Sequence, residues 1–224
     1  MQKHFHDWNL SEQEAIALQQ TLAAHVIQQD ELGQINTVAG LDVAYSDDDK
    51  RVYAAVVVLD AESLKVVDRA SVEECVSFPY IPGLFSFREI PPLLKALAGL
   101  QQMPDLLVCD GQGRAHPRRF GLASHLGYLL DVPSIGCGKT RLLGEEQAVA
   151  EARGSMGALM DNGEEIGRAL RTQDGIKPLY VSVGHKISLN SACDWILKLA
   201  PKYRQPETTR QADQLVRKLQ KANI

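Results

Sequence analysis

The sequence predicts an α/β protein built on one mixed sheet, in which three antiparallel strands are followed by parallel strands, flanked by helices. Two observations predict this class. First, apolar and β-branched residues dominate three closely linked runs at 35–45, 52–59 and 64–72, and strands joined by short links pair antiparallel. Second, short apolar runs at 106–110 and 133–137 each follow a helical segment, and the right-handed crossover rule places such strands parallel beside the first.

The first third of the chain supplies a helix and the antiparallel strands. Ser11 followed by Glu14 forms a capping box, and apolar residues then recur at helical spacing, which predicts a helix over 11–29. The first strand carries Asp42 within it. The turn-like residues 60–63 join the second strand to the third, as expected for antiparallel neighbours.

The rest of the chain alternates helices and strands. Two prolines stiffen the segment 78–83, which leads into a predicted helix from near Phe87 towards Leu100. The later predictions are a helix over 121–130, a loop or lid over 145–165, a hairpin of strands 166–171 and 179–183, and helices starting after Ser188 and from about Glu207. No repeat or low-complexity linker interrupts them, so we expect a single domain over residues 1–224.

Composition indicates a soluble, cytoplasmic protein with no membrane partner. Of the 224 residues, 45% are hydrophobic, yet no run approaches the roughly 20 apolar residues of a membrane span. The amino terminus also lacks the apolar core of a signal peptide. The cysteines Cys75, Cys109, Cys137 and Cys193 form no Cys-x-x-Cys pair, so we expect buried, reduced thiols rather than a zinc site or disulfide framework. We also expect a monomer.

Positive charge is distributed unevenly along the chain. The net charge of -4 argues against indiscriminate binding to nucleic acid. Six basic residues nevertheless occupy the loops that follow Phe78, Asp110 and Gly136, namely Arg88, Arg114, Arg118, Arg119, Lys139 and Arg141. These loops form either a local basic groove or ordinary solvated surface.

The stretch after the strand at 106–110 carries the strongest functional signal. Asp110 ends a buried strand, and Gly111 then removes a side chain where a ligand can approach, beside several basic residues. A dinucleotide fingerprint needs glycine where His116 stands, and a phosphate loop needs glycine where Pro133 stands, so neither nucleotide motif is present. The alternative for Asp110 is a simple turn cap, since Asp-Gly is a strong turn dipeptide.

A second acid weakens that alternative. The parallel arrangement places Asp42 next to Asp110, and Glu89 begins the helix between the two strands. Converging carboxylates are costly without a cation, so we assign Asp42 and Asp110 as ligands of Mg²⁺, for which Mn²⁺ can substitute. Glu89 is a possible third ligand, and Glu207 or Asp213 a possible late acid. Such a centre is typical of phosphodiester hydrolysis.

Several ordered motifs strongly resemble the endonuclease V family. They run from about residue 8 to residue 213 and comprise AGLDVAY with Asp42, Phe78–Gly83, Phe87-Arg88-Glu89, Asp110–Gly113, Ala115–Arg118, Gly121 with Ala123-Ser124-His125, IGCGKTRLLG with Lys139, Gly184-His185 and PETTRQAD with Asp213. The resemblance implies a ribonuclease H-like fold and an Mg²⁺-dependent DNA repair endonuclease that recognises deaminated purine, chiefly hypoxanthine in deoxyinosine. Members nick the second phosphodiester bond 3′ to the lesion, leaving 3′-hydroxyl and 5′-phosphate ends.

The resemblance also implies roles for individual residues. Asp42, Glu89 and Asp110 match the catalytic acids, and Asp213 matches a late position that holds His or Asp. Tyr80 matches the residue that wedges into the duplex, completed by Ile81, Pro82 and Gly83. An aromatic held between two prolines suits base flipping, although a buried core aromatic is the alternative.

The remaining substrate contacts are expected from the loops. Backbone groups at Gly83, Gly111 and Gly121 read the purine edge, where O6 of hypoxanthine is an acceptor and adenine has a donor. Lys139 contacts the scissile phosphate or the attacking water, or else is a solvated loop lysine. His116 contacts the base pocket or phosphate, or else packs against Pro117. We expect structural roles for His125 and His185, and we assign none to His4 or His6.

Three positions depart from the family pattern, and two other functions compete. Thr208 replaces a proline, Gly138 replaces an alanine, and Phe85 replaces a leucine in the base pocket, where it narrows the pocket or stacks on the base. One competing function is another ribonuclease H-like nuclease acting on inosine-containing RNA, single strands or branched DNA. The other is a non-catalytic nucleic-acid binder, which retention of all the acids disfavours.

Overall fold

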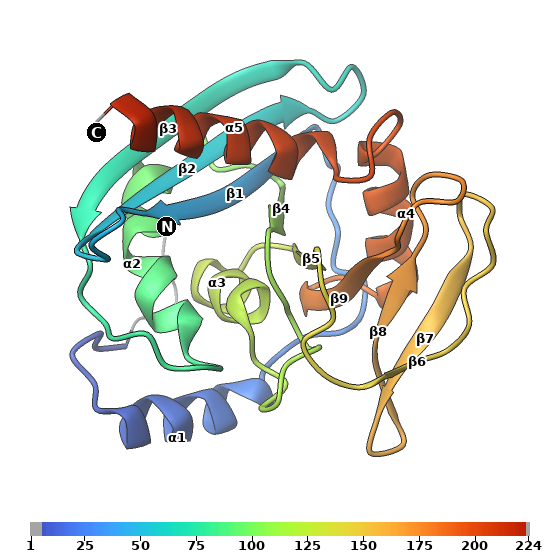
Figure 1. The fold of residues 1–224 in the computed structure, drawn as a ribbon, viewed down its shortest axis with the longest axis horizontal. Coiled ribbons are helices and arrows are strands. Elements are labelled where there is room, and N and C mark those ends of the chain that lie inside the picture. The colour runs from blue at the N-terminus through green and yellow to red at the C-terminus, as the bar shows by residue number, and fades with distance from the viewer. Residues whose placement is uncertain (1–5, 223–224) are drawn as a thin grey trace.

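The computed structural model describes residues 6–222 and contains one open sheet with helices against it (Figure 1). The helices are α1 (Glu12–Ala23), α2 (Phe85–Ala98), α3 (Leu122–Leu130), α4 (Leu189–Leu199) and α5 (Glu207–Ala222). The strands are β1 (Thr37–Tyr45), β2 (Arg51–Asp60), β3 (Val66–Cys75), β4 (Leu106–Cys109), β5 (Ser134–Gly138), β6 (Glu145–Glu146), β7 (Met156–Asp161), β8 (Glu164–Leu170) and β9 (Leu179–His185).

The strand order confirms the predicted mixed sheet. Within the described residues the order is β3-β2-β1-β4-β5-β9-β8-β7-β6. The first three strands pair antiparallel, and β4 and β5 then run parallel beside β1, as the crossover rule predicts. The predicted hairpin is also present, because β8 pairs antiparallel with β9.

Helices cover both faces of the sheet. On one face α2 and α3 pack against alternate residues of the central strands, including Ala39, Leu41 and Leu107. On the other face α4 packs against Val38, Leu106 and neighbouring strand residues, and α5 lies along β1 and β2 (Figure 1). Alternation along each strand thus places apolar side chains in two separate cores.

Close approach of α5 to the sheet depends on Gly40 in β1. A Cβ atom at this position would lie 2.1 Å from the backbone oxygen of Thr208 in the first turn of α5. Thr208 is fully buried at this contact. The absence of a side chain at Gly40 therefore lets α5 bring Asp213 towards the sheet.

Three expectations from the sequence are wrong in detail. The segment 145–165 is not a loop or lid, because it contains β6 and β7, which extend the sheet beyond β8. The first helix ends at Ala23 rather than near residue 29, although its capping box is present as predicted. Cys75 is exposed, whereas the other three cysteines are buried; all four are free.

Within the described part of the chain, no helix combines the length and apolar character needed to cross a bilayer.

Candidate active site

Asp42 and Asp110 lie side by side where β4 ends. β1 and β4 pair in register with Leu41 opposite Cys109, and the Asp110 amide donates to the Leu41 carbonyl oxygen at 3.3 Å. Both aspartates line one cavity of about 220 Å³, together with Glu89 from α2. The structure thus brings together the three acids that the sequence singled out.

Burial makes this group of carboxylates hard to ionise. It raises the pKa of Asp42 to about 7, with a further contribution from the neighbouring charge of Asp110. Burial, and then the charge of Asp42, raise the pKa of Glu89 to about 8. Burial also raises the pKa of Asp110, although the hydrogen bond from Lys139 opposes this effect. Additional positive charge would therefore stabilise the ionised site.

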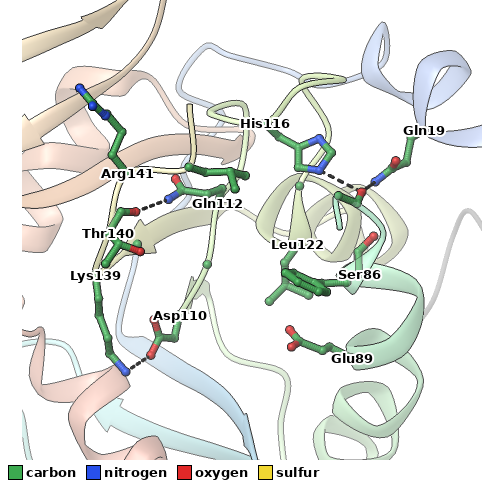
Figure 2. A pocket seen from close by; sticks show the side chains of 16 residues that line it. Gln19, Ser86, Glu89, Asp110, Gln112, His116, Leu122, Lys139, Thr140 and Arg141 are labelled. Atoms are coloured by element: carbon green, nitrogen blue, oxygen red, sulfur yellow. Dashed lines mark hydrogen bonds and ion pairs between the residues drawn. The ribbon is translucent and has the colours of Figure 1, made fainter. Parts of the chain in front are cut away.

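Lys139 is the cation nearest to these acids. Its ammonium pairs with Asp110, as Figure 2 shows, and lies 3.7 Å from Oδ1 of Asp213 on α5. Burial disfavours the charged lysine, but the contact with Asp110 outweighs burial and raises the pKa of Lys139. The guanidinium of Arg204 donates to the Lys139 carbonyl oxygen at 2.6 Å, which fixes the backbone of this loop. Lys139 is therefore tied into the acidic site.

Asp213, rather than Glu207, is the late acid that reaches this site. Asp213 also forms an ion pair with Arg217, one turn along α5, with 2.9 Å between Oδ2 and Nε. Glu207 instead accepts from Arg210 Nε at 2.7 Å and from Gln211 Nε2 at 2.6 Å within its own helix. The first turn of α5 thus satisfies Glu207 locally and leaves Asp213 to face Lys139.

The residues present fit a hard divalent cation held by few protein ligands. Within residues 6–222, no three His, Cys, Asp or Glu side chains are grouped as a metal cage. Mg²⁺ does not require such a cage, because it usually takes one or two carboxylates and completes its shell with water and phosphate oxygens. Asp42 and Asp110 supply that donor set, and their raised pKa values show that they lack sufficient positive charge.

A larger cavity of about 340 Å³ adjoins the acids (Figure 2). The two cavities share Glu89, Asp110 and Leu122 in their walls. Six residues expected to bind substrate line the larger cavity, namely Gly83, Phe85, Gly111, His116, Gly121 and Lys139. Its size lies within the usual range of roughly 300 to 1,000 Å³ for small-ligand pockets. We call this cavity, whose lining also includes Gln19 and Ser86, the base pocket, after the role expected from the sequence.

Tyr80, Ile81 and Pro82 form a loop beside the base pocket rather than part of its lining. Tyr80 is 66% exposed, which argues against the core-aromatic alternative, and its ring centroid lies 5.0 Å from that of Phe85. Ile81 instead packs partly buried against an apolar cluster that contains Phe78 and Phe87. The loop therefore has one apolar anchor and one projecting aromatic ring.

Both ends of this loop are fixed by hydrogen bonds. The buried Arg88 donates to the Phe78 carbonyl oxygen at 3.3 Å. The Gly83 carbonyl oxygen accepts from His116 at 3.0 Å, from Arg118 at 2.7 Å and from Gln19 at 3.1 Å. Gly83 has a φ of 81°, a conformation that favours glycine. Tyr80 is thus presented from a loop that is restrained on both sides.

A sequence profile of the endonuclease V family matches residues 20–214. The chain belongs to the endonuclease V family. Endonuclease V of Trichormus variabilis is 51% identical over 211 residues, which cover 94% of this chain and 96% of that protein. At this level of similarity the chain is an endonuclease.

Solved structures of the family share the fold. The crystal structure of endonuclease V from Streptomyces avermitilis matches with a TM-score of 0.92 and 50% identity, covering 97% of this chain and 96% of that chain. Endonuclease V from Ciona intestinalis, crystallised with DNA containing an inosine followed by a ribo-adenosine, matches with a TM-score of 0.81 and 27% identity, covering 93% and 97%. These similarities confirm the predicted ribonuclease H-like sheet.

His116 of this endonuclease uses both ring nitrogens within the protein. Nε2–H donates to the Gly83 carbonyl oxygen, and Nδ1 accepts from the Arg118 amide at 3.2 Å. Burial, and then the nearby Arg118 charge, lower the pKa of His116 to about 4. The imidazole is therefore neutral at pH 7, and it lines the pocket while holding the loop of Tyr80, Ile81 and Pro82 at Gly83.

Sequence reasoning about this endonuclease missed several residues that line its pocket, among them the buried polar residues Gln19 and Ser86. Gln19 is 1% exposed; its amide donates to the carbonyl oxygens of Gly83 and Phe120, and its oxygen accepts from Arg118 at 2.6 Å. Its position four residues after the buried Ala15 is a usable signal, because it places a polar group on the apolar face of α1. Ser86 gave no comparable signal.

The histidines outside the base pocket behave largely as expected. His125 is completely buried in α3, and His185 is 2% exposed in β9, in agreement with structural roles. His4 lies outside the described residues. His6, to which no role was assigned, forms a hydrogen bond with His125, with 2.7 Å between the two Nε2 atoms.

Proposed function

We propose that this endonuclease is an Mg²⁺-dependent DNA repair enzyme that recognises deoxyinosine and nicks the second phosphodiester bond on its 3′ side. The products carry 3′-hydroxyl and 5′-phosphate ends. The observation that carries the proposal is the shared wall between the base pocket and the cavity of Asp42 and Asp110, next to the exposed Tyr80. A flipped purine and a nearby phosphate then have adjoining sites. The Ciona relative crystallised with inosine-containing DNA supports this substrate class.

The acids and Lys139 perform the chemical step. Asp42 and Asp110 hold the divalent ion, with Glu89 oriented towards the same cavity by the hydroxyl of Tyr45, 3.4 Å away. When bound, Mg²⁺ polarises the phosphate and lowers the pKa of a bound water. Lys139 exchanges its contact with Asp110 for the scissile phosphate, and its fixed backbone keeps the ammonium within reach. Asp213 balances the charge of Lys139 from α5.

The wedge loop and the base pocket select the lesion. Tyr80, supported by Ile81, Pro82 and Gly83, fills the gap that a flipped base leaves in the stack. Backbone groups of Gly111 and Gly121 read the purine edge, and Phe85 and His116 contribute ring surfaces to the pocket wall. Because the loop is held at Phe78 and Gly83, little ordering entropy is lost when it enters the duplex.

One assay separates the proposed function from its competitors. Purified protein is incubated with a single-inosine duplex and an undamaged duplex in Mg²⁺, and the ends are mapped. The proposal requires one nick at the second bond 3′ to inosine, which disappears with excess chelator and returns with Mg²⁺ or Mn²⁺. Equal cutting of both duplexes would indicate a general ribonuclease H-like nuclease, and binding without a nick would indicate a non-catalytic binder. An inosine-containing RNA strand in the same assay tests that substrate.

We further propose that residues 1–224 act as a single domain and a monomer in the cytoplasm. One continuous sheet runs through the described residues, which supports the single domain. Four free cysteines suit a reducing compartment. Sedimentation at working concentration tests the oligomeric state directly.

A further inference from the structure

A chain of hydrogen bonds runs from the amino-terminal segment to the wall of the base pocket. His6 Nδ1 lies 2.6 Å from the carbonyl oxygen of Asp7, and His6 Nε2 lies 2.7 Å from Nε2 of His125. On the other side of that ring, Nδ1 of His125 lies 3.0 Å from the hydroxyl oxygen of Ser86. Ser86 belongs to α2 and lines the base pocket on the same side as Glu89 (Figure 2).

When both imidazoles are neutral, elementary hydrogen-bond rules fix the direction of every bond in this chain. A carbonyl oxygen only accepts, so His6 must carry its proton on Nδ1 and leave Nε2 bare. Nε2 of His125 must then carry a proton and donate it to His6. A neutral imidazole has one N–H, so Nδ1 of His125 is bare and accepts from the Ser86 hydroxyl. The carbonyl of Asp7 therefore assigns both tautomers and the orientation of the Ser86 hydroxyl.

The surroundings keep both imidazoles neutral, as this assignment requires. His125 is completely buried among aromatic rings, with Phe87 and Phe120 at centroid distances of 5.1 and 5.0 Å. His6 stacks on the same ring at 5.0 Å. Burial holds the pKa of each histidine below its ordinary value. Neutrality decides the directions, because a second proton on His6 would reverse the chain: His6 would donate to His125, and His125 would donate to Ser86.

Because the Ser86 hydroxyl donates its proton to His125, its oxygen can only accept further hydrogen bonds. Ser86 is 2% exposed, and within residues 6–222 its hydroxyl makes no other hydrogen bond. We propose that Ser86 determines base specificity by accepting a hydrogen bond from a ring N–H of the flipped base, with His125 and His6 as positioning residues that hold the hydroxyl in this orientation. This inference rests on the proposed function, because it concerns the same pocket.

The ligand chemistry that Ser86 selects is a lactam, a ring N–H beside a ring carbonyl. Hypoxanthine has such an N–H at N1, whereas N1 of adenine is a bare acceptor and would face the oxygen lone pairs of Ser86. Deamination therefore converts a repulsive contact into a hydrogen bond. Guanine has the same N–H, so its exclusion must come from elsewhere in the pocket.

Competitive binding to two modified duplexes tests the role of Ser86. One duplex contains a single inosine and the other a single unsubstituted purine nucleoside, which lacks both N1–H and the 6-oxo group. The ratio of dissociation constants is measured in chelator, so that no strand is cut. Ser86→Ala should reduce the inosine preference about tenfold, the equivalent of about 1.4 kcal/mol. An unchanged ratio in a folded Ser86→Ala protein would overturn the inference.

A substitution at His6 tests the hydrogen-bond relay, that is, the chain from Asp7 through His6 and His125 to Ser86. His6→Phe keeps an aromatic ring beside Trp8 but removes the acceptor for His125 Nε2–H. His125 can then place its proton on Nδ1 and donate to Ser86, whose hydroxyl becomes a donor towards the pocket. His6→Phe should therefore lower the inosine preference, and should have no further effect in a Ser86→Ala background. His25→Phe, at an exposed histidine stacked on Tyr128, is the matched control and should keep the parental ratio.

Nitrogen NMR of the free protein provides a readout that does not depend on substrate. The parent should show His125 protonated at Nε2 and bare at Nδ1, and His6→Phe should shift protonation towards Nδ1. A parent protonated at His125 Nδ1 would overturn the relay. Nicking of the inosine duplex in Mg²⁺ is scored separately: if the parent nicks and Ser86→Ala keeps the parental ratio, this inference fails while the proposed function stands.

Discussion

At the residue scale, the proposed chemistry depends on three carboxylates that lie in a poorly solvated site. Asp42, Glu89 and Asp110 lie together and are each half-buried, and each has a raised pKa because burial penalises the ionised form. A bound cation removes that penalty, whereas loss of one carboxylate removes half of the proposed ligand pair. The acids therefore matter for turnover much more than for contact with DNA.

Asp42→Asn and Asp110→Asn should abolish nicking. Each change removes a ligand charge while keeping side-chain size, so the rate should fall by more than the roughly 10 to 100-fold typical of outer-shell changes at metal sites. Binding to inosine-containing duplex should remain close to that of the parent. Single-turnover nicking and a binding titration measure the two effects, and near-parental turnover in Mg²⁺ by either variant would disprove the ligand assignment.

Tyr80→Ala should weaken lesion preference more than general DNA binding. Stacking of a base on an aromatic side chain contributes roughly 1 to 3 kcal/mol, so the inosine preference should fall about tenfold. Tyr203→Ala, at another exposed tyrosine outside the base pocket, is the matched control. Competition between damaged and intact duplex provides the measurement, and an unchanged preference would remove Tyr80 from the wedge.

The sequence predicts some of these residues far better than others. Asp42 and Asp110 are predictable because each is an acid in or directly after an apolar strand, and strand order then places them together. Gln19 and Ser86 are not identified, because their importance depends on partners about 40 to 100 positions away, such as Phe120 for Gln19 and His125 for Ser86. The only local sign is the polar side chain of Gln19 on the apolar face of α1, and Ser86 has none.

At the element scale, the start of α5 is positioned by backbone contact with β1, and Val216, Leu215 and Leu219 pack against the sheet further along the helix. The absent side chain of Gly40 lets Thr208 approach β1, and Asp213 then faces Lys139 one and a half turns along the helix. A small change in the helix position would alter the charge balance of the acidic site. The packing of α5 therefore links sheet structure to the proposed chemistry.

Gly40→Ala should destabilise the protein and reduce activity together. The added Cβ would lie 2.1 Å from a backbone oxygen, and overpacking of this kind costs about 1 to 3 kcal/mol in the free energy of unfolding. Gly33→Ala is the matched control, since no atom lies within 4 Å of the Cβ it would add. Denaturant unfolding measures both variants, and equal stability of the two would refute the close contact.

Element prediction succeeds where periodicity is strong and fails where strands are short. The buried run 52–59 of β2 and all of β4 are apolar, and β5 is buried with Ile135 and Cys137 at its centre, so these strands are identified directly. β6 has two residues, and β7 mixes exposed and buried positions, so this region reads as a polar loop. β7 forms because it pairs with the edge of β8, and β6 then pairs with β7. Both strands therefore depend on tertiary contacts.

At the scale of the whole molecule, mixed strand order explains how distant acids meet. The parallel crossover puts β4 beside β1, and α2 returns Glu89 to the same end of the sheet. This topology is predictable from the order of elements. The extension of the sheet by β9, β8, β7 and β6 is only partly predictable, because antiparallel addition to β5 has no sequence signature of its own.

Stability should depend on pH through the buried His116. Its pKa is about 4 in the folded protein and near 6.5 when unfolded. Its contribution to stability is therefore complete above pH 6.5 and is lost as pH falls towards 4, because the unfolded chain takes up the proton first. The loss is on the order of 3 kcal/mol.

A comparison of unfolding curves isolates this contribution. The free energy of unfolding of the parent should fall more steeply between pH 6.5 and pH 4 than that of His116→Asn. The exposed His25 supplies the matched control, since His25→Asn should follow the parent. Parallel curves for the parent and His116→Asn would show that His116 does not stay neutral in the folded protein.

Anomalous diffraction from crystals soaked in Mn²⁺ tests the central claim most directly. Mn²⁺ substitutes for Mg²⁺ at oxygen ligands and is located by its anomalous signal. The account predicts a peak bound by carboxylate oxygens of both Asp42 and Asp110, with the Lys139 ammonium moved away from Asp110. Saturating Mn²⁺ that leaves no peak between the two aspartates, or a peak that contacts neither, would contradict it.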